Sequence, residues 1–346
     1  MRGARRWALS DRGTGGGGRP RRAGDPFASA ASGQGSLRAR IRLYDAVRRM
    51  AQRGEVDVVD APDSQGWCAG WPKLPVPVVM HVHGSNTYFA HEAGRPAARM
   101  TAWLERSSAR RADFWCAVSR YAAERTQAIF GLSPVGAVVY PAIVVPEESD
   151  VDPEHRDPGK VIFTGNVTPK KGVVSLIDAW AEVKRARADA QLHFVGPTSA
   201  RVEGRPIVEY LLNRLPDSIR LSVSFHGPQP HSKLREALDR ARVAVYPSYS
   251  EAFAAAPMEA MAHGCATIYS PRASGRELIE HGRNGLLVDP DEPAEIARSI
   301  VRLLEDQREA ARLARAGRES VAERFSTEAA VRPVHAFFSE CVETYA

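Results

Sequence analysis

Short runs of β-branched and aromatic residues alternate with longer segments of helical periodicity from residue 37 to the C-terminus. Ten runs are predicted as strands: 56–60, 76–82, 113–119, 138–140, 161–165, 192–196, 223–227, 243–247, 266–270 and 286–288. Strands joined through helices cannot pair as tight hairpins, so they form parallel sheets that helices cover. We therefore expect an α/β protein with four strands before residue 146 and six after residue 159.

An acidic, proline-containing stretch at 146–159 separates the two groups of strands and is predicted as a linker. A chain of 346 residues is long enough for about two domains. We predict a partial first domain over 37–145, a second domain over 160–325 and a C-terminal helix over 326–346.

The first 36 residues show no apolar periodicity and are predicted to be a disordered basic leader. Residues 1–40 carry nine Arg and two Asp, so the remaining 306 residues sum to a charge of −1. A nucleic-acid partner requires basic charge on a folded face, and we expect none. The four scattered cysteines and the lack of an 18-residue apolar run favour a cytoplasmic protein without disulfide or zinc sites.

Ligands of parallel α/β sheets bind where the strands end, and three strand ends carry unusual residues. The first is the loop Gly165-Asn166-Val167-Thr168-Pro169-Lys170-Lys171-Gly172, which precedes a helix. A helix N-terminus beside a lysine is a candidate anion site. The loop matches neither a Walker A motif nor GxGxxG, so a solvated basic loop is the alternative.

The second strand end runs from Pro247 to Gly264. Pro257 suits the first turn of a helix and Gly264 its C-terminal end. The unpaired amides of that first turn can then face phosphate groups. Glu251 and Glu259, eight residues apart, favour recognition of hydroxyl groups, because a carboxylate accepts hydrogen bonds from sugar hydroxyls.

The third strand end, His81-Val82-His83-Gly84, belongs to the first group of strands. A histidine in this position is a general base, a hydrogen-bond donor or an ordinary loop residue, and the residues alone leave the choice open.

The segment from Glu251 to Glu259 resembles the E-x7-E motif of family 4 glycosyltransferases, which have the two-domain GT-B fold. VIFTGNVTPKKG, LHFVG, the segment ending VAVYPSYSEAF, MEAMAHGCATIYS and SGRELIEHGRNGLLVDPDEPAEIARSI follow in the family's order. The resemblance is strong over 158–306 and weaker over 55–145. It implies two Rossmann-like domains, the C-terminal one complete. The N-terminal one is expected to lack its first strands, since nothing before Leu37 supplies the strand, Gly-rich loop and further strands with which that domain opens in the family.

The resemblance also implies a reaction: transfer of a sugar from a nucleotide-sugar donor to an acceptor, with retention of configuration and without a metal or cofactor. Glu251 would bind the transferred sugar, Lys171 would neutralise the diphosphate and His83 would lie near the reacting sugar. Glu259 would hold the donor ribose. The other donor-binding positions would be Gly165, Asn166, Lys170, His226, Gly227, Phe253, Ala254, Ala255 and Ala256.

Two positions depart from the family pattern. Asn166 stands where the family usually has Arg, which makes Lys170 a candidate for the missing phosphate contact. Ala254 replaces the usual Gly and restricts the approach of the backbone.

Donor and acceptor are not specified by these motifs. A UDP- or GDP-sugar is expected as donor, and a saccharide, a lipid-linked glycan or a small molecule as acceptor, with peripheral membrane contact as a further expectation. A non-catalytic nucleotide-sugar-binding remnant is the alternative. A nicotinamide-dependent oxidoreductase is a third reading, and the lack of GxGxxG after a strand counts against it.

Overall fold

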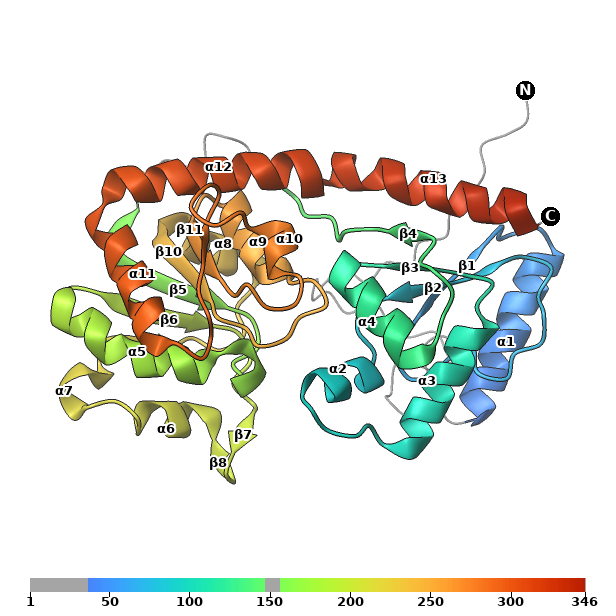
Figure 1. Cartoon of the computed structure of the whole chain (residues 1–346), viewed down its shortest axis with the longest axis horizontal. Helices are drawn as coiled ribbons and strands as arrows, with labels where there is room; N and C mark the ends of the chain where they lie inside the picture. The colour runs from blue at the N-terminus through green and yellow to red at the C-terminus, as the bar shows by residue number, and fades with distance from the viewer. Residues whose placement is uncertain (1–36, 147–155, 346) are drawn as a thin grey trace. The chain divides into compact units, whose positions relative to one another are not determined.

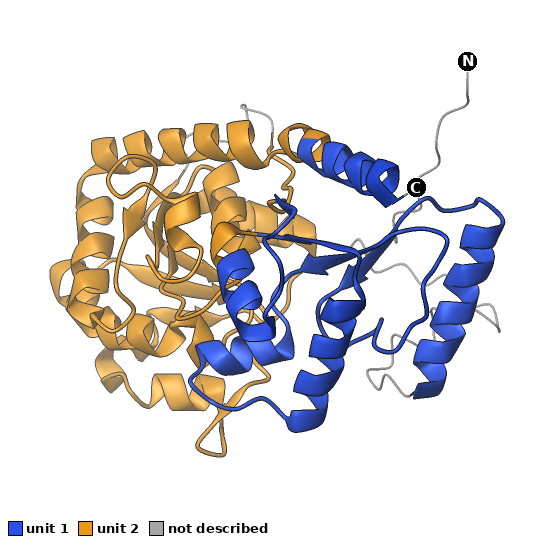
Figure 2. Ribbon diagram, turned by 45° about the vertical axis from the view of Figure 1, so that its right-hand side comes forward, with its two compact units in different colours: residues 1–118, 122–139, 333–346 blue, residues 119–121, 140–332 orange. Residues whose placement is uncertain are grey.

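The computed structural model describes residues 37–146 and 156–345 of the chain (Figure 1). The chain divides into two compact units (Figure 2). Unit 1 comprises residues 1–118, 122–139 and 333–346, and unit 2 comprises residues 119–121 and 140–332. The predicted leader at 1–36 lies outside the described residues, as does most of the predicted linker.

Unit 1 contains a parallel sheet whose four described strands follow one another in the order β1-β2-β3-β4. The strands are β1 (Val59–Pro62), β2 (Val78–Val82), β3 (Phe114–Ala117) and β4 (Ala137–Val138). The helices are α1 (Leu37–Gln52), α2 (Asn86–Glu92), α3 (Arg99–Arg111) and α4 (Arg120–Phe130). The four strands expected before residue 146 are confirmed.

Two features of unit 1 differ from the sequence prediction. The strand expected at 56–60 is β1, which begins at Val59 because its pairing with β2 starts at Val59 and Val78. Helix α2 was not predicted, since seven residues are too few to show a helical period. It is held by tertiary contacts, because the buried Glu105 accepts hydrogen bonds from the amides of Asn86 and Thr87 at 3.2 and 2.9 Å.

Unit 2 contains a six-stranded parallel sheet in the order β12-β11-β10-β5-β6-β9. The strands are β5 (Asp157–Thr164), β6 (Gln191–Val195), β9 (Val223–Phe225), β10 (Ala241–Tyr246), β11 (Ala266–Tyr269) and β12 (Leu286–Leu287). The chain moves outward from β5 through β6 to β9, then returns to the other side of β5 at β10. The strand order therefore reverses between β5 and β10, which is where doubly wound sheets bind ligands.

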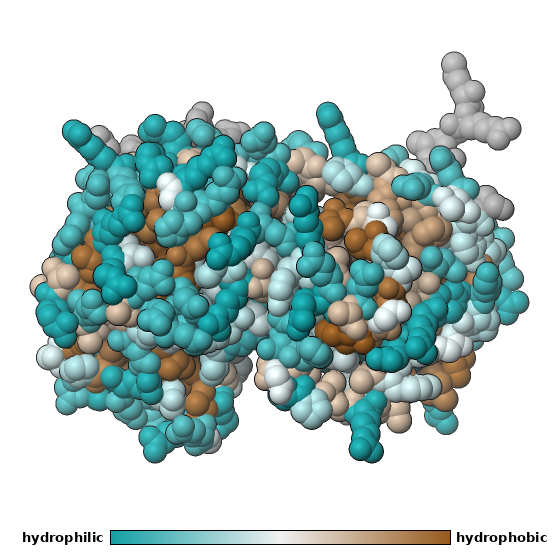
Figure 3. Space-filling view, viewed as in Figure 1, coloured by the Kyte–Doolittle hydropathy of each residue, from teal (hydrophilic) through white to brown (hydrophobic). Residues whose placement is uncertain are grey.

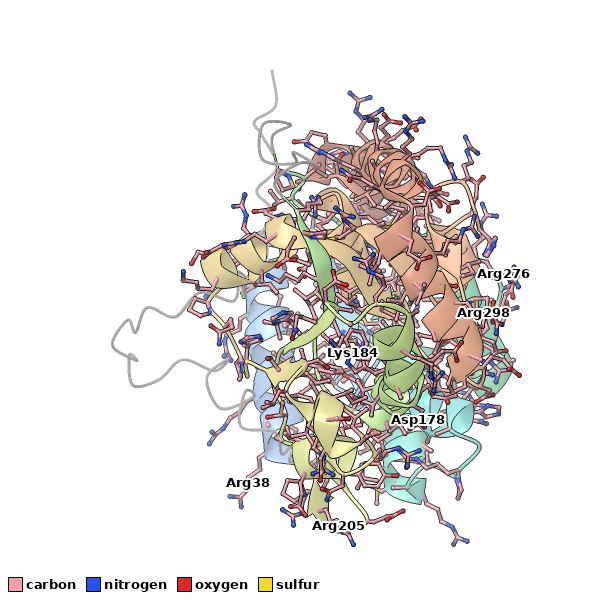
Figure 4. All side chains as sticks on the ribbon, turned by 90° about the vertical axis from the view of Figure 1, so that its left-hand side faces the viewer. Arg38, Asp178, Lys184, Arg205, Arg276 and Arg298 are labelled. Carbon is pink, nitrogen blue, oxygen red and sulfur yellow. The ribbon has the colours of Figure 1, made fainter. Side chains whose placement is uncertain are left out.

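Helices cover both faces of this sheet (Figure 1). The helices after β5 are α5 (Val173–Ala186), α6 (Ile207–Leu212), α7 (Asp217–Arg220), α8 (His231–Arg240), α9 (Ala255–Ala262), α10 (Gly275–Leu278), α11 (Pro293–Glu305) and α12 (Gln307–Phe325), with a 3-10 turn at Pro169–Lys171. The last helix, α13 (Thr327–Tyr345), lies mostly in unit 1. Helix α5 illustrates how apolar side chains face the core of unit 2 and charged ones face outward. Ile177 and Trp180 are fully buried, whereas Asp178 points outward from α5 (Figure 4) and pairs with Arg214 at 2.7 Å.

Two bounds and one additional hairpin in unit 2 differ from the sequence prediction. Strand β5 begins at Asp157, inside the predicted linker. Helix α9 begins at Ala255, so Pro257 is its third residue. A hairpin of β7 (Arg201–Val202) and β8 (Arg205–Pro206) was not predicted. Its strands have two residues each, too short for an alternating pattern.

Helix α13 passes from unit 2 into unit 1 after residue 332. Phe337 and Phe338 pack into the core of unit 1, and the Tyr345 hydroxyl donates to the Leu74 carbonyl at 2.8 Å. Hydrophilic side chains cover most of the face of the protein seen in Figure 3. None of the described helices is both long and apolar enough to cross a bilayer.

Candidate active site

The loops that follow β5, β6, β9 and β10 meet at the carboxyl edge of the unit 2 sheet. The Gly165 amide donates to the Val195 carbonyl at 2.9 Å, and the Gly196 amide donates to the Gly227 carbonyl at 2.9 Å. The Tyr249 amide donates to the Lys170 carbonyl, also at 2.9 Å. Main-chain hydrogen bonds thus join four loops that are far apart in the sequence, at the point where the strand order reverses.

Two glycines allow these loops to approach so closely. Gly172 has φ of 71°, and a Cβ atom there would lie 1.7 Å from the Pro247 carbonyl oxygen. Gly196 has φ of 145°, and a Cβ atom there would lie 2.1 Å from the Gly165 carbonyl oxygen. Glycine alone fits both positions, because the left-handed conformation and the contact each exclude a side chain.

Lys171 and Glu251 form an ion pair between the loop after β5 and the loop after β10. The Glu251 side chain is 9% exposed and the Lys171 side chain 25%. The two residues were predicted separately, as a phosphate ligand and a sugar ligand, and the structure brings them into direct contact. Asn166 is exposed on the same loop as Lys171.

The N-terminus of α9 supplies main-chain donors beside this ion pair. Ala254 is the N-cap residue, and its side chain has no group that could bond the first amides of the helix. The amides of Ala255 and Ala256 therefore lie among the unpaired donors of the first turn. Ala255 is exposed and Ala256 half-buried, so this turn reaches the surface. Ala254 has φ of −95°, which alanine adopts without strain.

Glu259 lies one turn further along α9 and is half-buried. Burial raises the pKa of the Glu259 carboxyl, and the nearby His231, the first residue of α8, opposes that shift. A carboxylate with incomplete hydration gains more from hydroxyl donors than a solvated one does, because it gives up less water on binding.

His226 and Gly227 follow β9 at the outer end of the same edge. The His226 ring stacks on His193 with ring centroids 5.2 Å apart, and His226 Nε2 lies 3.0 Å from His193 Nδ1. Burial lowers the pKa of His193 to about 4, with Lys160 and His226 adding to the shift, so His193 is neutral at pH 7. Sequence reasoning missed His193, because the pairing of β6 with β9 decides which residue faces His226.

His83 differs from every other predicted site residue, because it belongs to unit 1. It follows β2, and its ring lies against His81 with centroids 4.3 Å apart. The buried Asp63 accepts a hydrogen bond from the Gly84 amide at 3.0 Å and so fixes the turn that carries His83. The assignment of His83 to the reacting sugar stays a prediction.

Comparison with known families shows to which family the chain belongs. The family described as Glycosyl transferases group 1 matches residues 145–320, which include the whole of the loop cluster above. The chain belongs to the glycosyl transferases group 1. A second family, Glycosyltransferase Family 4, matches residues 12–147 and so begins within the predicted leader. The recognition made from the E-x7-E motif and the other matching segments is thereby confirmed. This member of the glycosyl transferases group 1 is an enzyme of the glycosyltransferase class.

Relatives and solved structures agree with that membership. An alpha-D-kanosaminyltransferase of Streptomyces kanamyceticus is 26% identical over 289 residues, covering 78% of this chain and 73% of the relative. A sucrose-phosphate synthase structure from Thermosynechococcus elongatus matches with a TM-score of 0.71 at 19% identity, covering 89% and 79% of the two chains. The Anabaena protein Alr3699/HepE, solved in complex with UDP and glucose, matches with a TM-score of 0.66 at 20% identity, covering 89% and 80%. These structures confirm the expected α/β fold of GT-B type.

Within residues 37–146 and 156–345, no group of three or more His, Cys, Asp or Glu side chains is arranged to hold a metal ion. The cations of the site are Lys170 and Lys171. This arrangement can bind a diphosphate through lysine and main-chain amides, and sugar hydroxyls through the two glutamates.

Proposed function

We propose that this glycosyltransferase moves a sugar from a UDP- or GDP-sugar to an acceptor with retention of anomeric configuration. The observation that carries the proposal is the convergence of Lys171, Glu251 and the first turn of α9 where the strand order of unit 2 reverses. The Anabaena structure with UDP and glucose supports a nucleotide-sugar donor.

The ion pair of Lys171 with Glu251 suggests how the site takes up a donor. Each charged group holds the other in place. When a donor binds, its diphosphate competes for the Lys171 ammonium group, and sugar hydroxyls replace that group as donors to Glu251. Lys171 then contacts the diphosphate and Glu251 contacts the sugar, on the two sides of the bond that breaks.

The departing nucleoside diphosphate gains negative charge as the glycosidic bond breaks. Lysine and oriented amides that face this charge stabilise the transition state more than the ground state. We further propose that Glu259 holds the ribose and that His226 and Gly227 lie against the base.

Release of nucleotide from a panel of UDP-, GDP- and ADP-sugars tests the proposal, with and without simple sugar acceptors. The expected result is release from a UDP- or GDP-sugar, and NMR of the glycoside product then shows the same anomeric configuration as the donor. Tight binding of UDP or GDP without release from any donor would instead support the non-catalytic remnant.

Metal independence is the next expectation. Because Lys171 and the α9 amides would offset the leaving-group charge, the rate of nucleotide release should change by less than about twofold when EDTA is added. Magnesium added back serves as the control. A loss of rate that magnesium restores would contradict the assignment of charge compensation to Lys171.

We also propose contact with an anionic membrane surface through the outer face of α3. Met100 and Trp103 are 68% and 63% exposed, which is unusual for such large apolar side chains. Arg99, Arg106 and Arg110 are exposed on the same face. A helix face that combines Trp and Met with arginines suits the boundary between headgroups and acyl chains.

Sedimentation with lipid vesicles tests this surface. Trp103→Ser should lower binding to vesicles that contain phosphatidylglycerol by about tenfold, because it removes apolar contact with the bilayer. Leu221→Ser is the matched control, since Leu221 is 94% exposed but lies in unit 2. Equal binding by the two variants would exclude α3 as the docking face.

A cytoplasmic location is also proposed. All four cysteines, Cys68, Cys116, Cys265 and Cys341, are free and buried. Free thiols are the ordinary state of cysteine in a reducing compartment, which supports the proposal.

A further inference from the structure

Residues 251–256 form the end of the loop after β10 and the first two residues of α9. Two side chains that belong to none of the predicted motifs contact this segment. We call this segment the donor loop. The fully buried Ser119 donates its hydroxyl to the Ala252 carbonyl at 2.7 Å. The Tyr140 ring packs against the Phe253 ring with centroids 5.2 Å apart. Two adjacent residues of the donor loop are thus held, one through its backbone and one through its side chain.

Both supports depend on one carboxylate, that of Glu277 in α10. Glu277 accepts hydrogen bonds from the amides of Arg120 and Tyr121, each at 2.9 Å, and from the Tyr140 hydroxyl at 2.9 Å. Arg120 directly follows Ser119, so fixing its amide also fixes the serine that holds Ala252. All of these residues belong to unit 2.

An aromatic cluster makes the support of Phe253 rigid. The buried Phe325 lies 5.3 Å from Tyr140 and 5.4 Å from Phe253 between ring centroids. Arg324 donates to the main-chain carbonyl of Glu277 at 2.6 Å. Because three rings contact one another and the Glu277 backbone is also held, the Phe253 side chain has little room to move.

We propose that Glu277 is a positioning residue for sugar transfer, acting through Ser119 and Tyr140 on the donor loop. The proposal rests on the proposed function of that loop. Catalysis by preorganised amides requires that they point at the developing charge before the reaction begins, and an error of about 1 Å costs as much as about 100-fold in rate. Glu277 does not contact the donor itself, so its role is to hold the amides of Phe253–Ala256 in place.

The chemistry of the carboxylate suits this role. A carboxylate offers acceptor positions only, which matches the three donors that face Glu277. Burial raises the pKa of Tyr140 to about 12, and the hydrogen bond to Glu277 adds to the shift. The phenol therefore keeps its proton and donates at every working pH. A glutamine would place an NH₂ group against one of the three donors and lose at least one bond.

Two variants and a matched control test the proposal with UDP and UDP-glucose as probes. Glu277→Gln should lower the rate of UDP release from UDP-glucose by about 10- to 100-fold, and Tyr140→Phe by about threefold to tenfold. The Kd for UDP should change by less than about twofold in both, since Lys171 and Glu259 are untouched. Glu280→Gln is the control, because Glu280 is 57% exposed and pairs with Arg283. An equal loss of rate and UDP affinity in Glu277→Gln would overturn the positioning role.

A second measurement does not depend on the identity of the donor. In TROSY NMR spectra of the whole chain, the amide signals of Phe253–Ala256 should shift in Glu277→Gln and in Tyr140→Phe but not in Glu280→Gln. Unshifted signals would overturn the proposal, whatever the activity. Shifted signals in a protein that releases no nucleotide from any donor would support the positioning contact while refuting the proposed function. If Glu277→Gln fails to fold, Tyr140→Phe still decides, because it keeps the packed ring.

Discussion

Lys171→Ala should lower the rate of nucleotide release by about two orders of magnitude, the largest effect that we expect from a single change in the site. One donor aimed at leaving-group charge contributes roughly 3 kcal/mol to the transition state, which corresponds to about a 100-fold change in rate. The measurement is release of UDP or GDP at saturating donor, so that weaker binding cannot account for the loss. Unchanged turnover would refute the role of Lys171.

A second consequence of this change follows from the ion pair. The Glu251 side chain is only 9% exposed, and Lys171→Ala leaves its charge without the partner ammonium group. A buried carboxylate without a partner is destabilising, so the melting temperature should also fall. The double variant Lys171→Ala with Glu251→Gln should recover stability but not turnover, which separates the two effects. Lys233→Ala is the matched control, since Lys233 is exposed and pairs with the exposed Glu236 at 2.7 Å.

Glu259→Ala should weaken binding of the donor nucleotide by about tenfold or more. Hydrogen bonds to a charged group contribute roughly 1.5–3 kcal/mol, and the ribose would lose its carboxylate acceptor. Calorimetry with UDP or GDP measures the change. Glu236→Ala serves as the control, because Glu236 lies in the same unit with an exposed side chain. Equal affinity of wild-type protein and Glu259→Ala would reject the ribose assignment.

A nucleotide without ribose hydroxyls makes this test specific. The wild-type protein should bind 2′,3′-dideoxy-UDP more weakly than UDP, whereas Glu259→Ala should bind both about equally. If the loss of affinity on removing the ribose hydroxyls and the loss on Glu259→Ala simply add, Glu259 does not contact the ribose.

The raised pKa of Glu259 gives this assignment a pH dependence. Because burial raises that pKa, the carboxylate is protonated at a higher pH than an exposed glutamate would be. Affinity for UDP should therefore fall as the pH is lowered through this raised pKa, and Glu259→Ala should remove that dependence. Stability has the opposite pH dependence. Because burial raises the pKa of Glu259 in the folded state, the contribution of this group to the free energy of unfolding falls as the pH rises through that pKa.

The sequence predicted elements well where their signal is local. The strands of unit 2 and helix α5 follow from runs and periods that lie within about 15 residues, and the structure has them within a few residues of the predicted ends. Short elements were missed. Helix α2 and the β7–β8 hairpin carry too few residues for a period, and contacts such as those of Glu105 with Asn86 and Thr87 hold α2 in place.

In the candidate site, too, a local sequence pattern was predicted and contacts between distant residues were not. The spacing of Glu251 and Glu259 is a local pattern, because both residues flank one helix start. Together with the other matching segments between residues 158 and 306, it identified the family. The contact of Lys171 with Glu251 spans 80 residues, that of His193 with His226 spans 33, and that of Glu277 with Tyr140 spans 137. None of these three pairs follows from spacing along the chain.

By itself, then, the sequence determined the order of strands and helices and the family, and it predicted which residues would bind a nucleotide sugar. Only the tertiary structure decided that Lys171 rests on Glu251, that His193 supports His226 and that Glu277 holds the donor loop. The physical reason is that periodicity records which face of an element is buried, whereas these contacts depend on strand order. The order β12-β11-β10-β5-β6-β9 is selected by the packing of the whole sheet and its helices, not by any one segment.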